Sequence, residues 1–191
     1  MFTNAILRAI DERRSIRAFE NKELTQDEIE LLRQAVLAVP TAMNLQELKY
    51  SFILDTNIIE EISQAVIKTF EQEKNQEALE RIRGRHTSVF YGAPLVITIS
   101  APAGNSYSDV NAGIAVQTLA LAAQGMGLGS CIIGMAKAAF SGSKARKCKE
   151  LARIPADCEL IISIAIGHAA ISKEAHDLRP DNITFVRNNS N

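Results

Sequence analysis

Apolar residues in this chain follow two spacings, one typical of helices and one typical of strands. Ile6, Leu7 and Ile10 fall on one face of a short helix that Thr3 or Asn4 can cap. Short β-branched runs, such as residues 95–100, are typical of buried strands. Along the chain these patterns predict helices at about 4–10, 25–39, 57–70, 108–124 and 144–152, and strands at 50–54, 95–100, 128–133 and 160–166.

Polar residues indicate where several of these helices begin. Thr25–Glu28 has the spacing of a capping box, in which each side chain accepts a hydrogen bond from the other residue's backbone N–H group. Asn57–Glu60 has the same spacing, and Ser108 or Asp109 can cap a later helix. Pro40 stops the second helix, because proline cannot continue the helical hydrogen bonds.

The order of the elements predicts a single domain over residues 1–191. Helices alternate with dispersed strands, which favours an α+β or α/β fold built on one sheet. The highly charged residues 71–85 are expected to form a solvated helix or a mobile excursion, within a segment of about 71–91. Residues 169–191 form a C-terminal extension without helical periodicity, in which 183–186 could pair as a terminal strand.

The predicted helix that contains Val110 to Gln124 is apolar nearly all round and rich in alanine. A helix without a polar face is usually buried in the centre of a domain or in an interface. Asn111, Gln117 and Gln124 argue against a membrane span.

Composition narrows the classes of function. The net charge of −1 argues against general binding of nucleic acid or of an anionic membrane. The three cysteines form no CxxC pair, so we expect a reducing, cytoplasmic environment and no metal site. The first residues reach Asp11 and Glu12 before any long apolar run, which is unlike a secretory signal.

The segment Arg13-Arg14-Ser15-Ile16-Arg17 places three guanidinium groups within five residues. Arginine offers a planar fork of donors that suits phosphate and other oxyanions. The functional interpretation is an anion or cofactor clamp. The structural alternative is a solvated helix end, whose cations complement the helix dipole.

Two further segments are candidates for ligand contact. Residues 40–46, Pro-Thr-Ala-Met-Asn-Leu-Gln, connect a helix to a strand, and their amide and hydroxyl groups suit either a turn or the edge of a heterocycle. The glycines of residues 125–130 follow a helix and precede a strand, which is the reverse of a dinucleotide-binding turn. We expect a helix end there, with Ile133-Gly134 beyond it able to approach a flat ligand. No serine-hydrolase elbow or pair of catalytic acids stands out, so an enzyme of this sequence would borrow its chemistry from a cofactor.

Taken together, five segments resemble the FMN-dependent nitroreductase family over residues 5 to about 186. The motifs that carry the resemblance are residues 13–19 (RRSIRAF), 40–46 (PTAMNLQ), 90–94 (FYGAP), 109–134 with its GSCIIG ending, and 164–168 (IAIGH).

The resemblance implies a nitroreductase-like α+β fold, with one mixed, mainly antiparallel sheet flanked by helices in an intertwined homodimer. It also implies two FMN sites at the subunit interface. The residues that it assigns to FMN binding are Arg13, Arg14, Ser15 and Arg17 from one subunit, and Pro40, Thr41, Ala42 and Asn44 from the other, with Ile133 and Gly134 against the ring and Arg179 at the phosphate. It further implies that the C-terminal extension packs on the partner.

The implied reaction is a ping-pong transfer of two electrons from NADH or NADPH, through FMN, to a nitroaromatic, quinone or similar small acceptor. No side chain is expected to react itself. Arg17 is the candidate electrostatic stabiliser, because a fixed cation favours a flavin that gains negative charge.

Two parts of the chain depart from the family pattern. Glu47-Leu48 stands where many members have Pro-Trp, which alters the site wall and adds a negative charge. Asp177 replaces a second phosphate-binding cation, a role that Lys173 could take. The same fold also suits dehalogenation, flavin fragmentation, or FMN binding without turnover, as in a redox sensor.

Overall fold

The computed structural model describes residues 3–85 and 87–187. Its centre is a four-stranded antiparallel sheet in the order β1-β2-β4-β3. The strands are β1 (Lys49–Ile53), β2 (Leu95–Pro102), β3 (Gly129–Ile133) and β4 (Cys158–Gly167). Pairing along this sheet is antiparallel throughout, which places the fold in the α+β class and confirms the predicted nitroreductase-like arrangement of one sheet with flanking helices.

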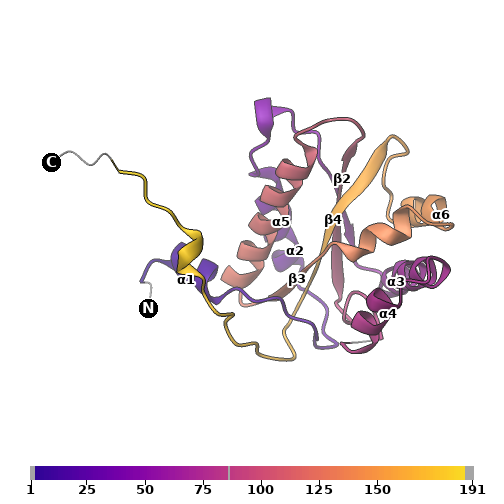
Figure 1. Cartoon of the computed structure of the whole chain (residues 1–191), viewed down its shortest axis with the longest axis horizontal. Helices are drawn as coiled ribbons and strands as arrows, with labels where there is room; N and C mark the ends of the chain where they lie inside the picture. Colours follow the sequence, from indigo (N-terminus) through magenta and orange to yellow (C-terminus); the bar gives the residue numbers. More distant parts are fainter. Residues whose placement is uncertain (1–2, 86, 188–191) are drawn as a thin grey trace.

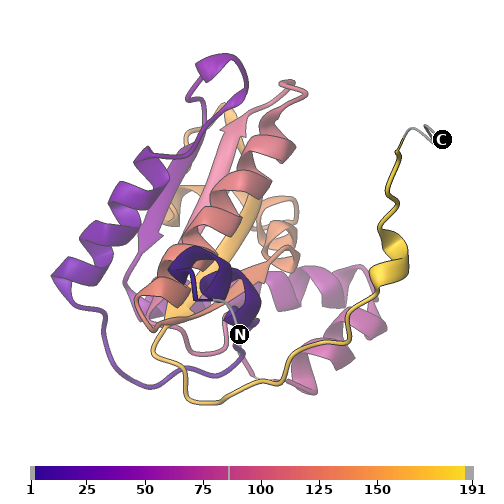
Figure 2. The same cartoon turned by 90° about the vertical axis from the view of Figure 1, so that its left-hand side faces the viewer.

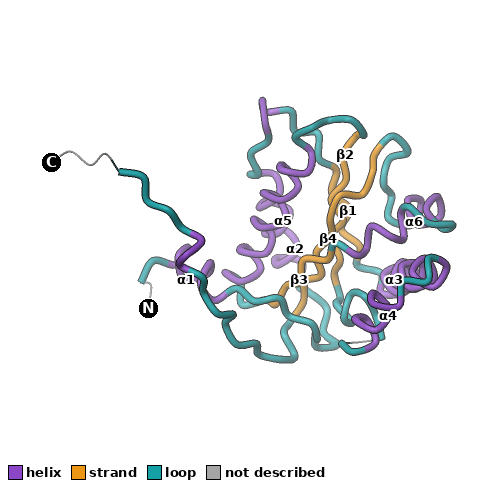
Figure 3. Tube along the Cα trace, in the orientation of Figure 1, coloured by secondary structure: helices purple, strands orange, loops and turns teal. Residues whose placement is uncertain are grey.

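Helices cover both faces of this sheet (Figures 1 and 3). One face carries α2 (Gln26–Leu37) and α5 (Ser108–Gly125), and the other carries α3 (Thr56–Gln72), α4 (Gln76–Arg83) and α6 (Ala145–Leu151). The remaining elements are α1 (Ala5–Glu12) and the short 3₁₀ turns η1 (Ala42–Asn44), η2 (Met135–Phe140) and η3 (Pro180–Asn182).

The central strand β2 is buried on both faces, as its continuous apolar run predicts. Leu95, Ile97 and Ile99 pack with α2 and α5 in one hydrophobic cluster, whereas Val96 packs with α3 in the other. Burial of each such side chain contributes about 1.5–3 kcal/mol. The sheet therefore lies between the two hydrophobic clusters and contributes residues to both.

Helix starts are partly as the sequence predicts. The capping box of Thr25 and Glu28 is formed, with both reciprocal hydrogen bonds present. The predicted box at Asn57–Glu60 is wrong, because Asp55 caps α3 by accepting hydrogen bonds from the backbone of Asn57 and Ile58. The predicted cap at Ser108 or Asp109 is also wrong, since neither side chain makes a cap hydrogen bond at the start of α5.

The charged segment packs on the core through two apolar residues. Its α4 helix turns its charges outward and buries Leu79 and Ile82 against the α3 side. Residues 89–91 lie inside the hydrophobic cluster under α3. Residues 71–85 therefore contain the end of α3 and a mostly solvent-exposed amphipathic helix, as the first of the two expectations has it.

The C-terminal segment leaves the body of the molecule (Figures 1 and 2). Residues 183–187 pair with no strand of the described chain, so the predicted terminal strand is absent here. Leu178, Phe185 and Val186 are exposed. Among residues 3–85 and 87–187, no helix is long and apolar enough to cross a bilayer.

Candidate functional site

The arginine segment continues into a strap, residues 13–20, that crosses the end of the sheet. Ile16 N–H donates to the carbonyl of Ser130 at 2.9 Å, and Glu20 N–H donates to that of His168 at 2.9 Å. The two contacts fix the strap against the start of β3 and the end of β4. Ser15 forms a parallel bridge with Ser130 within the same contact.

Two glycines permit this close crossing. Gly129 and Gly167 face each other in the β3–β4 register. A Cβ on Gly167 would lie 2.6 Å from Pro94 Cδ and 3.1 Å from a ring carbon of Phe19, and one on Gly129 would lie 3.1 Å from Ile16 Cγ1. Larger residues at either position would lift the strap from the sheet.

Arg14 has a structural partner. Its guanidinium donates to the carbonyls of Asp11 at 2.5 Å and Arg13 at 2.9 Å, just after α1 ends. A cation at this position complements the negative end of the helix dipole. For Arg14, the structural alternative, a cation at a helix end, therefore explains the contacts of one terminal nitrogen. The Nε atom of Arg14 is buried and has no hydrogen-bond partner among the described residues.

Arg13 and Arg17 differ from Arg14, because neither guanidinium forms a hydrogen bond or ion pair with any residue in 3–85 or 87–187. Arg17 Nε is buried and lacks an acceptor. Leaving such a donor unsatisfied costs about 1–3 kcal/mol. The side chain is therefore arranged for an acceptor that the described protein does not provide.

Four cations, Arg13 and Arg17 among them, act electrostatically on β3. Burial raises the pKa of the Cys131 thiol in β3, while Arg17, Arg85, Lys173 and Arg13 oppose that shift through their charges. All four side chains therefore lie near enough to act on one point of β3. Such a cluster suits an anionic ligand.

A cavity of about 270 Å³ lies beside the strap. It brings Arg14, Ser172 and Lys173 together, next to Gln124 and Gly127 at the end of α5. Lys173 therefore lies beside Arg14 on the wall of this cavity, which Glu12 also lines.

The second predicted segment, residues 40–46, lies at the opposite end of α5. Ala42 N–H donates to Asn111 Oδ1 at 3.1 Å in the first turns of that helix. Residues 111 and 124 are 13 positions apart along α5, a separation of about 20 Å. A single chain therefore does not bring the arginine strap and this loop into one site.

The remaining predicted residues lie in two places. Ile133 is buried at the end of β3, and the exposed Gly134 follows it with space for a Cβ 3.7 Å from Ile162. Neither packing nor a positive φ requires glycine at 134. Arg179 precedes η3 on the extended tail, and Figure 2 shows this part of the tail well separated from α1.

Sequence reasoning missed Arg85, Asn111 and Ser130. Arg85 lies in a charged segment with no motif around it. Asn111 is a buried polar residue in a mostly apolar helix, which is a usable signal, because a buried amide needs partners. Within the described residues, no group of three or more His, Cys, Asp or Glu side chains could hold a metal ion.

Comparison with known proteins identifies what this architecture is similar to. The sequence model of the nitroreductase family matches residues 10–168. A nitroreductase from Desulfitobacterium hafniense DCB-2, solved with bound FMN, is 28% identical, with a TM-score of 0.92 over 97% of this chain and 100% of that one. No curated protein matches significantly.

Two more distant structures share the fold. An FMN-bound nitroreductase from Bacteroides fragilis NCTC 9343 is 21% identical, with a TM-score of 0.89 over 97% of this chain and 100% of that one. An NADPH:FMN oxidoreductase from Vibrio harveyi, solved with NAD⁺, is 21% identical, with a TM-score of 0.72 over 97% of this chain and 77% of that one.

Proposed function

The chain belongs to the nitroreductase family, and we propose that it is an FMN-dependent oxidoreductase that uses NADH or NADPH to reduce a nitroaromatic, a quinone or a similar small acceptor. The observation that carries the proposal is the pair of unpartnered arginines, Arg13 and Arg17, on the strap beside β3. The FMN-bound Desulfitobacterium structure, which matches almost the whole chain, supports FMN as the ligand.

The residues of the strap fit this cofactor. FMN offers an anionic phosphate and a flat ring edged with hydrogen-bond acceptors. Arg13, Arg17 and Lys173 supply unpaired cations, and Arg17 Nε supplies an enclosed donor that lacks an acceptor. Gly134 leaves the end of β3 open to a flat surface.

Each group then has a distinct part. When bound, FMN supplies the two-electron chemistry, accepting hydride from a nicotinamide and delivering both electrons to the acceptor in a ping-pong sequence. Arg17 donates to the ring edge and holds positive charge where negative charge develops. Arg13 and Lys173 bind the phosphate of FMN, and Arg179 on the C-terminal tail is a further phosphate contact. Arg14 and Ser15 hold the strap in place beside this site.

We further propose that the site is completed by a second copy of this chain. The strap and the loop of Pro40, Thr41, Ala42 and Asn44 lie at opposite ends of α5, so an FMN that touches both needs two chains.

Exposed apolar surface supports this homodimer. On α5, Val110 is 60% and Ile114 is 40% exposed, and on α1 Ile6, Leu7 and Ile10 are 69%, 46% and 52% exposed. Such faces are typical of a subunit interface. The C-terminal extension, 169–191, would pack on the partner. The buried free thiols support a reducing compartment such as the cytoplasm.

Reduction of the purified protein by nicotinamides tests the proposal. We expect a yellow protein, or a colourless one that binds added FMN, whose visible flavin absorbance is bleached rapidly by NADH or NADPH without oxygen. Nitro, quinone and enone compounds should then restore the colour at measurable rates. Protein that binds FMN but is not bleached by either nicotinamide would instead indicate a binding or sensing role, and protein that never binds FMN would refute the proposal.

A further inference from the structure

The loop between α2 and β1 holds a backbone conformation that its residues do not favour. Met43, Asn44 and Gln46 have φ values of 53°, 54° and 49°. In this left-handed region an L side chain costs about 1–2 kcal/mol, and asparagine tolerates it best. Such a conformation persists where surrounding contacts determine it.

Hydrogen bonds within the loop do not attach it to the fold. Gln46 N–H donates to Thr41 Oγ1 at 2.9 Å, and the Gln46 amide donates to Asn44 Oδ1 at 3.0 Å. These bonds join residues of the loop only to each other. The position of the loop must therefore be set by other contacts.

Asn111 makes those contacts. Its side chain is buried in α5, at 1% exposure, and reaches both ends of the loop. Asn111 Oδ1 accepts from Ala42 N–H at 3.1 Å, while Asn111 Nδ2 donates to Glu47 Oε1 at 2.7 Å. One amide therefore joins the residue before the strained turn to the residue after it.

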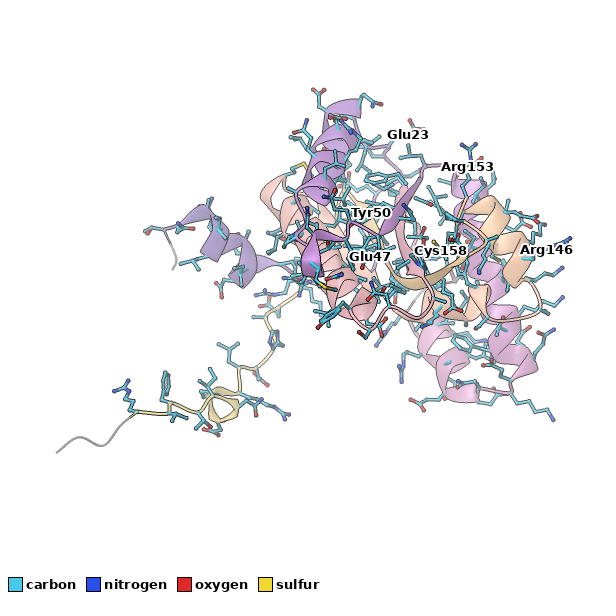
Figure 4. The ribbon with its side chains drawn as sticks, turned by 90° about the horizontal axis from the view of Figure 1, so that it is seen from above. Glu23, Glu47, Tyr50, Arg146, Arg153 and Cys158 are labelled. Carbon is cyan, nitrogen blue, oxygen red and sulfur yellow. The ribbon has the colours of Figure 1, made fainter. Side chains whose placement is uncertain are left out.

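Glu47 determines which way that amide faces. A carboxylate only accepts hydrogen bonds, so it draws Nδ2 toward itself and leaves Oδ1 for Ala42. Asn105 donates a second, longer hydrogen bond to Glu47 Oε1, at 3.4 Å. Figure 4 shows Glu47 near Tyr50, where the chain returns from the loop into the sheet. The α5 N-terminus, which has no side-chain cap, favours a negative charge there.

The second oxygen of Glu47 indicates that this arrangement costs stability. Oε2 is buried without a hydrogen-bond partner among the described residues. A buried, unpartnered carboxylate oxygen is destabilising. The fold keeps Glu47 at this position in spite of that cost.

We propose that Glu47 is a positioning residue, which acts through Asn111 to hold the 41–46 loop in the conformation that binds FMN. The proposal rests on the proposed function, because it is the loop's part in the FMN site that makes its position matter. Glu47 itself need not touch the cofactor. The departure from the family pattern at this position then has a physical role.

Isosteric variants test the hydrogen bond. Asn111→Asp keeps the acceptor for Ala42 but replaces the donor to Glu47 with a repelling carboxylate. We expect about a tenfold weaker FMN affinity, measured by titrating the FMN-free protein, and faster hydrogen exchange at the amides of Ala42 and Gln46. Exchange in β2 serves as the internal reference for global stability. Glu23→Gln, at an exposed position, is the matched control.

Reversing the pair separates positioning from general damage. In the double variant Glu47→Gln with Asn111→Asp, the amide introduced at position 47 donates to the carboxylate introduced at 111. We expect FMN affinity and loop protection to recover most of the loss. Tight FMN binding by Asn111→Asp, or a double variant no better than Asn111→Asp alone, would overturn the proposal. Wild-type protein that binds no FMN would overturn this proposal together with the proposed function, whereas the first two results would leave that function standing.

Discussion

Replacing Arg17 tests whether its side chain serves a ligand or the fold. Arg17→Met keeps the aliphatic stem and removes the guanidinium. In FMN-free protein this change removes a buried Nε that has no hydrogen-bond partner among the described residues. We therefore expect the free energy of unfolding without FMN to stay the same or to rise, with a gain of about 2–4 °C in Tm for each kcal/mol.

The effect on FMN binding should have the opposite sign. A charge-assisted hydrogen bond from a guanidinium contributes about 1.5–3 kcal/mol. At about 1.4 kcal/mol for each factor of ten, Arg17→Met should raise the Kd for FMN roughly 10- to 100-fold. Quenching of flavin fluorescence during titration measures the Kd, and circular dichroism follows thermal unfolding of the same FMN-free samples.

A matched control is available on the other side of the molecule. Arg146 is exposed, lies 3.6 Å from Glu150, and is far from the loop side of the sheet in Figure 4. Arg146→Met should change neither quantity. Our reasoning is refuted if Arg17→Met binds FMN as tightly as wild type, or if it lowers the Tm of the FMN-free protein by several degrees.

Three other perturbations have defined outcomes. Ile114→Glu places a charge on the exposed face of α5 and should yield folded monomers by analytical ultracentrifugation, whereas an unchanged dimer would exclude that face from the interface. Gly167→Ala forces its Cβ toward Pro94 and should lower both Tm and FMN affinity; unchanged values for both would show that the strap does not need this close approach. Burial and the nearby Glu47 charge raise the pKa of Tyr50 from 10.0 to about 12. Because the folded state holds this proton more tightly, that contribution to stability is complete below pH 10 and disappears as pH rises toward 12; denaturant unfolding from pH 8 to about 11 should show the decline, and a rise in stability would contradict it.

The sequence predicts most of the fold because the signals involved are local. The Thr25–Glu28 capping box, for example, depends only on residues that lie within four consecutive positions. The strands are short apolar runs, and their boundaries shift by only a few residues in the structure. The caps of α3 and α5 were assigned incorrectly because several polar residues lie near each start, and only tertiary geometry decides among them.

The site is less predictable because its contacts join distant parts of the chain. The arginine motif marks Arg13, Arg14 and Arg17 alike, but only the structure distinguishes the helix-capping Arg14 from the two unpartnered arginines. Asn111 forms hydrogen bonds with Ala42, which lies 69 positions before it in the sequence, and with Glu47, which lies 64 positions before it. No local pattern encodes such a contact.

A heterodimer measurement tests the central claim that two copies of this chain build each FMN site. Two differently tagged chains, one carrying Arg17→Met and the other Asn44→Asp, would be coexpressed and the mixed dimer purified through both tags. A shared site predicts one intact FMN site per heterodimer, with wild-type affinity, while each variant homodimer binds weakly. If every site lies within one chain, both sites of the heterodimer are defective, and the absence of tight FMN binding would contradict the account.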